Sequence, residues 1–274
     1  MIALGAGRRP SDLAAVSLSL DEMQVLMQLV GMDRLPTVLM AIGRHADADE
    51  RDQAYAKARE DLAERGLLTG DQVHVDLEDR IGALSRPHWV VAMRLYIGDS
   101  ISRLCLAKGD DLHVLVLRGP ESYLVSEVEH GALAAALVSA LPVARGLEFN
   151  EFRLPTDRLS AIANGMTDPN ATAAELADAA RVGPEQTREV ANALTTVVSK
   201  AEIVGVVYGE GSQDVAPGNI AVFDTPDGRI LIGSNPVDGG AKWSSVSTGS
   251  APRLRKAIQD LINALPTRQA FPTR

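Results

Sequence analysis

The chain has little that would support metal binding, disulfides or hydrolysis. It contains a single cysteine, Cys105, so no disulfide can form within it, and the thiol lies in an apolar run typical of a core position. The five histidines are scattered singly, which argues against a structural zinc site. A hydrolase is a weak hypothesis, because no Gly-x-Ser-x-Gly elbow is present. Gly5-Ala6-Gly7 follows no strand pattern, so we expect neither a dinucleotide nor any other cofactor.

Positive charge and long apolar runs are also scarce. The net charge is −9, with 27 Lys and Arg against 36 Asp and Glu, and no basic block occurs, so we expect no nucleic-acid partner. No apolar run approaches the roughly 20 residues that span a bilayer, so no membrane insertion is expected. Arg8-Arg9 precedes an apolar run too short for an export signal. With its one cysteine, the chain fits a cytoplasmic location.

Two stretches of the chain have the pattern of a four-stranded meander followed by a helix. Pro226-Asp227-Gly228 joins two apolar runs and predicts a tight antiparallel hairpin in the second stretch. The predicted strands there are 203–208, 219–224, 229–233 and 242–246, with turns at 209–218 and 235–240 and a helix at 251–265. The corresponding earlier strands are 89–97, 101–107, 112–117 and 123–128, with a helix at 133–141.

Each meander is preceded by a strand and several helices. In the first half, a strand at 16–20 leads to a helix with Asp21 as its N-cap candidate. An extended run at 35–42 and helices at 50–65 and 71–84 follow. The second half begins with a strand at 147–154 and helices at 156–164, 173–181 and 184–200.

This repeated order predicts an internal duplication. Short sequence matches support it, such as Ser139-Ala140-Leu141-Pro142 against Asn263-Ala264-Leu265-Pro266. We therefore predict an α/β (α+β) fold with a quasi-twofold internal duplication, in which helical bundles flank a central, mostly antiparallel sheet. The expected organisation is a flexible arm at 1–15 and a single domain at 16–274, made of halves at about 16–142 and 147–266. An open sheet of that size leaves part of one face free for a protein partner.

An ordered set of segments resembles a known family. The set comprises Leu18-Ser19-Leu20-Asp21-Glu22, the segment 89–94, the segment 104–117, the segment 223–229, the segment 238–244 and the closing helix 253–266. Together they resemble the EspG family, the ESX (type VII) secretion-associated proteins of actinobacteria. The resemblance implies a quasi-symmetric α/β fold and a non-enzymatic, cytoplasmic chaperone. It further implies that the chaperone keeps PE/PPE heterodimers soluble by covering the apolar tip of the PPE subunit and delivers them for export.

Amphipathic side chains on or beside the predicted strands are the candidate partner contacts, because such residues dominate binding energy at interfaces. They are Arg94, Tyr96, Arg103, Tyr208, Arg229, Lys242 and Trp243. An exposed sheet and apolar helices would also permit a homodimer.

The alternative is a winged-helix-like transcriptional regulator, with residues 62–68 as the end of a helix and a turn, 71–84 as the recognition helix and the hairpins as wings. That helix carries four acidic residues against the single Arg80, so it would repel phosphates.

Overall fold

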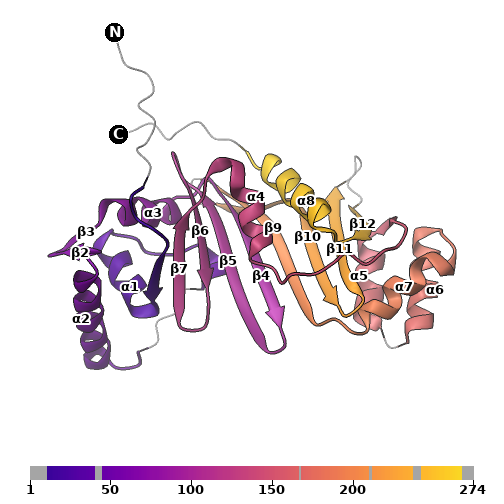
Figure 1. Ribbon diagram of the computed structural model, residues 1–274, viewed down its shortest axis with the longest axis horizontal. Helices are drawn as coiled ribbons and strands as arrows, with labels where there is room; N and C mark the ends of the chain where they lie inside the picture. The colour runs from indigo at the N-terminus through magenta and orange to yellow at the C-terminus, as the bar shows by residue number, and fades with distance from the viewer. Residues whose placement is uncertain (1–10, 41–44, 167, 210–211, 237–241, 267–274) are drawn as a thin grey trace, which may run out of the picture.

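One ten-stranded antiparallel sheet runs along the whole molecule (Figure 1). The computed structural model describes residues 11–40, 45–166, 168–209, 212–236 and 242–266. The strands are β1 (Val16–Ser19), β4 (Trp89–Ile97), β5 (Ser100–Lys108), β6 (His113–Arg118), β7 (Ser122–Glu127), β8 (Phe152–Pro155), β9 (Ser199–Tyr208), β10 (Gln213–Thr225), β11 (Gly228–Pro236) and β12 (Lys242–Thr248).

The strand order reads the same from both edges of the sheet. It is β1-β7-β6-β5-β4-β9-β10-β11-β12-β8, so each half of the chain contributes five strands in matching positions. The halves meet where β4 pairs with β9, from Trp89 opposite Val207 to Ile97 opposite Ser199. The predicted fold class, a quasi-twofold duplication around a central antiparallel sheet, is confirmed.

Helices pack at both ends of the sheet and over the middle of one face (Figure 1). The elements are α1 (Leu20–Leu29), η1 (Thr37–Leu39), α2 (Ala48–Glu64), α3 (Val75–Ser85), η2 (His130–Ala132), α4 (Leu133–Ser139), α5 (Thr156–Gly165), α6 (Pro169–Ala180), α7 (Pro184–Leu194) and α8 (Ala251–Asn263). The helices α1 to α3 form an N-terminal bundle and α5 to α7 a C-terminal bundle, while α4 and α8 lie side by side over the centre.

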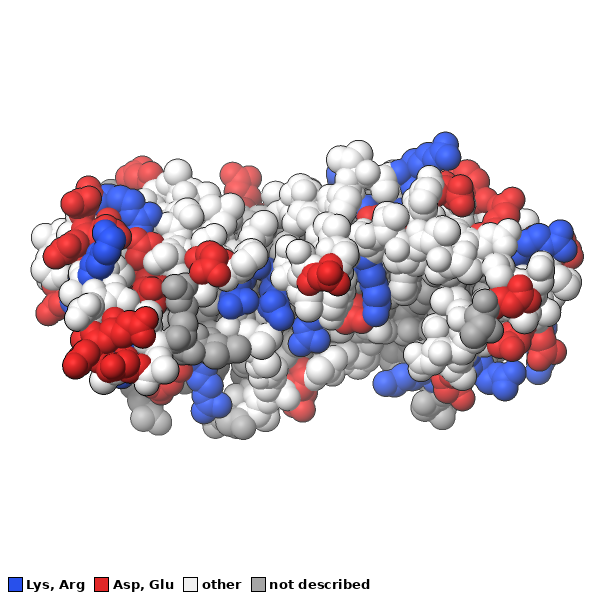
Figure 2. All heavy atoms as spheres, turned by 90° about the horizontal axis from the view of Figure 1, so that it is seen from below, with Lys and Arg blue, Asp and Glu red and all other residues white. Residues whose placement is uncertain are grey.

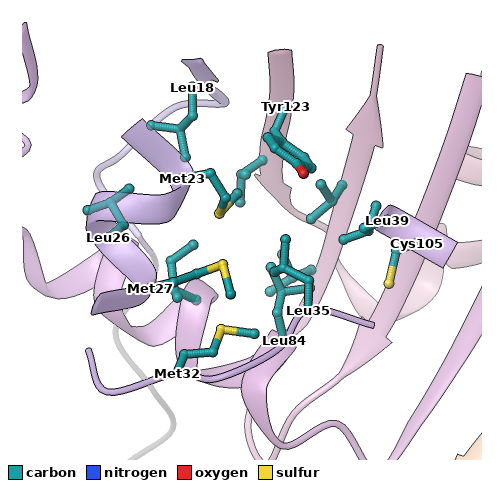
Figure 3. Packing of buried hydrophobic residues seen from close by; sticks show 14 of the residues in the cluster. Leu18, Met23, Leu26, Met27, Met32, Leu35, Leu39, Leu84, Cys105 and Tyr123 are labelled. Atoms are coloured by element: carbon teal, nitrogen blue, oxygen red, sulfur yellow. The ribbon is translucent and has the colours of Figure 1, made fainter. Parts of the chain in front are cut away.

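The alternation of side chains divides the core between the two faces of the sheet. Under α4 and α8, Met93 and Ile203 belong to one cluster with Leu137 and Ile258. The opposite face carries two clusters, one beneath each bundle. Figure 3 shows the N-terminal one, in which methionines from α1 fill the space between that helix and Tyr123.

Several predicted element boundaries are wrong. The helix expected after Asp21 begins at Leu20 because Ser19 caps it: the Ser19 Oγ accepts from the Glu22 backbone N–H at 3.1 Å, and Glu22 accepts from the Ser19 N–H at 2.6 Å. The extended run predicted at 35–42 contains the short η1 instead, and residues 41 and 42 lie outside the described part.

The other errors place the ends of helices and strands. The helix predicted at 71–84 begins only at Val75, because Gly70 with φ +60° allows β2 (Leu68–Thr69) and β3 (Gln72–Val73) to form a hairpin first. The helix predicted at 184–200 ends at Leu194. The strand predicted at 147–154 is only Phe152–Pro155. The turn expected at 235–240 lies mostly outside the described residues.

The described end of the predicted flexible arm lies against α3. Arg80 of α3 donates hydrogen bonds to the carbonyl oxygens of Ala14, at 2.8 Å, and Leu13. Ser11 donates to Asp76 at 2.8 Å. Residues 11–14 are therefore held on α3, while residues 1–10 lie outside the described part of the chain.

Candidate protein-binding surface

The two bundles leave the middle of one sheet face uncovered. The face opposite α4 and α8 carries the first core cluster at its N-terminal end and the third at its C-terminal end. Between them we define the central face by the outward residues Arg94, Tyr96, Arg103, Lys200 and Glu202 of β4, β5 and β9, each exposed or half-buried. Figure 2 shows several Lys and Arg side chains side by side across the middle of the molecule.

An apolar groove lies at one end of the central face. It has a volume of about 210 Å³, and β4, β9, η1 and β10 line it. Its apolar residues are Val38, Val90, Ala92, Val204, Val206 and Val215. Val215 is 68% exposed, which is unusual for a valine on a strand of a large sheet.

A break in β10 shapes this groove. The pairing of β10 with β9 shifts register between Val215 and Asn219, where Pro217 and Gly218 follow each other. Gly218 has φ +89°, and proline has no N–H to donate to a neighbouring strand, so both residues suit a bulge. The sequence pattern suggested a turn over 209–218. The structure instead extends β10 back to Gln213, which pairs with Tyr208.

Polar side chains close both ends of the apolar groove. Arg94 and Glu202 are cross-strand neighbours at one end. At the other end lie Tyr208 and Gln213, and Gln213 accepts a hydrogen bond from Thr37 of η1 at 3.4 Å. Burial, with a smaller contribution from Cys105, raises the pKa of Tyr208 to about 12. The phenol therefore stays protonated near neutral pH and can donate a hydrogen bond.

Glu202 is already engaged by residues of its own surface. The Lys200 Nζ lies 2.6 Å from its carboxylate, and the Tyr96 hydroxyl donates to it at 3.4 Å. Lys200 also lies over the Tyr96 ring, 5.7 Å from its centroid. These contacts hold Tyr96 against the sheet, and among the described residues Glu202 forms its ion pair with Lys200, not with its cross-strand neighbour Arg94.

The structure brings four of the seven predicted contact residues together. Arg94 and Arg103 are direct cross-strand partners, Tyr96 follows two residues along β4, and Tyr208 borders the apolar groove. Lys242 and Trp243 lie apart on β12, with β10 and β11 between them and β9. Trp243 is 40% exposed and points to the side of the sheet opposite the central face.

Arg229 was predicted as a partner contact, and the structure contradicts this. The residue is only 3% exposed. Its guanidinium forms two hydrogen bonds with Asp224, at 2.5 and 2.9 Å, and donates to the Pro142 carbonyl at 2.6 Å. A partner cannot reach this side chain, whose role is to hold the connection between the halves against the sheet.

Sequence reasoning missed Lys200 and Glu202. The helix predicted over 184–200 placed Lys200 at a helix end, whereas β9 begins at Ser199. Residues 196–198 are β-branched and favour extended backbone, so they could have indicated that the helix ends before Lys200. The contribution of Val38 could not be found because η1 was read as an extended run.

The winged-helix alternative is wrong. The helix α3 packs on β5, β6 and β7 through its apolar side, with Leu77, Ile81 and Leu84 buried. Its first turn is acidic, with Asp76 and Glu78.

Within the described residues no cluster of His, Cys, Asp or Glu is arranged to bind a metal ion. None of the helices described is both long and apolar enough to cross a bilayer.

The ten-stranded duplicated sheet with a helical bundle at each end defines a fold class. The structure superposes with a TM-score of 0.75 on the Mycobacterium tuberculosis type VII secretion system chaperone EspG5, solved in complex with the PE25-PPE41 dimer. The superposition covers 94% of this chain and 99% of that one, at 14% sequence identity. This match establishes the shared fold.

The sequence places the chain within one family of that class. The EspG family matches residues 19–260, and the chain belongs to it. It is 24% identical over 263 residues to the ESX-3 secretion-associated protein EspG3 of Mycolicibacterium smegmatis, covering 94% of this chain and 89% of the relative. It is 25% identical over 282 residues to EspG3 of Mycobacterium tuberculosis, with 94% of each covered.

Proposed function

We propose that this chain is a cytoplasmic, non-enzymatic chaperone of a type VII secretion system. It binds a PE/PPE heterodimer through the PPE subunit, keeps the heterodimer soluble and delivers it for export. The observation that carries this proposal is the match, over 94% of the chain, to a chaperone solved with a PE-PPE dimer bound. Family membership over residues 19–260 supports it.

We place the docking site on the central face and the apolar groove. A chaperone that shields an apolar tip needs apolar surface of its own, bordered by polar groups that fix orientation. The apolar groove supplies the apolar surface, with Val215 largely exposed. The polar groups that border it are Arg94, Tyr96, Arg103 and Tyr208. Lys242 is proposed only as an additional contact for a partner large enough to reach β12. Trp243 lies on the other side of the sheet and is proposed as a contact only for a partner that also passes around that edge.

The proposal is tested by co-expressing the chain with PE/PPE heterodimers of the same organism. Size-exclusion chromatography with light scattering should give a peak at the summed mass of one copy of each of the three chains. If every heterodimer elutes apart from the folded chain, the proposed function is wrong.

A matched pair of substitutions tests the position of the docking site. Val215→Asp puts a charge into the apolar groove and should weaken binding by about 10-fold or more, because the carboxylate must be desolvated on docking. Val143, which is fully exposed, lies outside the lining of the apolar groove. Val143→Asp should leave the dissociation constant unchanged. Equal affinity of the two variants would remove the apolar groove from the interface.

A further inference from the structure

Three arginines lie directly beside one another across the central strands. Arg103 of β5 is the cross-strand partner of Arg94 on β4 and of Arg118 on β6. We call these residues the arginine row. Side chains opposite each other on one sheet face lie about 4.5 to 5.5 Å apart at Cβ, where like charges repel. The row therefore destabilises the unbound chain unless an anion neutralises it.

In the described part of the chain, the anion next to the row is Glu202, the cross-strand partner of Arg94. No ion pair joins the arginine row to a carboxylate there. Glu202, the acidic neighbour of Arg94, is bound by Lys200 at 2.6 Å. The remaining contact of the row is that of Arg118 with Tyr123, a hydrogen bond at 3.3 Å and a ring contact at 5.8 Å.

The middle arginine has a buried donor without a partner. The Nε of Arg103 is inaccessible to solvent and makes no hydrogen bond within the described residues. A buried N–H of this kind costs free energy, and a guanidinium presents its donors in a planar fork that matches a carboxylate. Because this Nε is buried, an anion could meet only the other guanidinium nitrogens of Arg103, which is half-buried. The repulsion along the row points to an anion that arrives from outside the chain and binds there.

We propose that the arginine row binds a carboxylate of the docked partner. The inference rests on the proposed function. The carboxylate would belong to an acidic residue of the PPE subunit, close to the apolar segment that fills the apolar groove. Ala92, in the groove, and Arg94 are two residues apart on one strand, about 7 Å. An acidic residue about one helical turn from an apolar anchor would meet both at once.

The charge of the chain supports this choice of occupant. With a net charge of −9, the protein generally repels acidic surfaces. The arginine row is a local exception, so an acidic side chain of the partner has one preferred position on this surface. Arginine favours bidentate binding of a carboxylate, and such charge-assisted bonds fix geometry as well as adding affinity.

The test uses the PE/PPE heterodimer that co-purifies with the wild-type chain. Arg94→Gln combined with Arg103→Gln should weaken binding by about 10- to 100-fold. The wild-type dissociation constant should rise with salt more steeply than that of the double variant. The control is Arg188→Gln on the exposed side of α7, which should bind like wild type.

A stability measurement separates a binding role from a structural one. Removing the central charge by Arg103→Gln should raise the melting temperature of the unbound chain by about 1 to 3 °C while binding weakens. A lowered melting temperature together with unchanged affinity would mean that the row stabilises the fold, and would overturn the proposal.

The outcomes distinguish this proposal from the one on which it rests. If wild type and the double variant bind the heterodimer equally at low and high salt, the arginine row is not a contact and the chaperone function stands. If wild type binds no heterodimer, both fail. Replacing the contacting acidic residue of the PPE subunit by its amide should weaken binding to the wild-type chain by a similar factor. The same replacement should not further weaken binding to the Arg94→Gln, Arg103→Gln double variant, because the contact is already lost there.

Discussion

At the residue scale, two arginines of the same sheet have opposite surroundings. Arg94 is exposed on the central face, whereas Arg229 is buried and paired with Asp224. Their sequence contexts are alike, since each lies in an apolar strand segment. What distinguishes them is whether other residues cover the strand. The connection that begins at Pro142 lies over β11 at Arg229, whereas Arg94 is exposed among the described residues.

The buried pair predicts a large effect on stability. Arg229→Met should lower the free energy of unfolding by about 3 to 5 kcal/mol, because it leaves the carboxylate of Asp224 buried without its partner. Urea unfolding followed by circular dichroism measures this. Arg253 forms a comparable ion pair with Glu151, but both side chains are exposed. Arg253→Met should therefore cost less than about 1 kcal/mol. Similar losses from both substitutions would contradict the structural role assigned to Arg229.

At the element scale, the hairpins were predicted well and the helix boundaries poorly. The hairpin at Pro226-Asp227 and the strand Trp89–Ile97 follow from turn residues and apolar runs that are local in the sequence. The β2 and β3 hairpin and the end of α7 depend on short segments whose pattern fits either structure. The apolar groove could not be predicted at all, because η1 and β10 approach each other only in the folded chain.

The hairpin between β10 and β11 depends on one glycine. Gly228 has φ +145°, and a Cβ there would lie 2.7 Å from the Leu147 backbone nitrogen. The connection between the halves passes at this point, since the Leu147 N–H donates to the Arg229 carbonyl at 2.9 Å. Gly228→Ala should therefore lower the free energy of unfolding by about 2 kcal/mol or more.

A second glycine provides the control for this substitution. Gly82 lies in α3, and a Cβ added there would meet nothing within 4 Å. Gly82→Ala should leave stability unchanged or raise it by up to about 1 kcal/mol, because alanine favours helix. Urea midpoints of the two variants give the comparison. A Gly228→Ala variant as stable as Gly82→Ala would show that the connection is free to shift.

At the scale of the whole molecule, the two halves share one sheet and one core cluster. The pairing of β4 with β9 spans nine residue pairs, from Trp89 opposite Val207 to Ile97 opposite Ser199. Beneath α4 and α8, Leu137 of the first half and Ile258 of the second belong to the same cluster. An isolated half would expose the long edge of its central strand and half of this cluster. We therefore propose that the domain from residue 16 onward unfolds as one cooperative unit.

One probe in each half tests this cooperativity. In a Trp89→Phe variant, the fluorescence of Trp243 reports on the second half. Cys105 reports on the first, since its thiol is buried and burial raises its pKa, so it should react with a disulfide reagent only on unfolding. The urea midpoints of fluorescence and of thiol reactivity should coincide, because separating β4 from β9 would uncover the core of both halves. Thiol exposure at a clearly lower urea concentration than the fluorescence change would mean that the halves unfold independently, and that the shared sheet is a docking of two stable units.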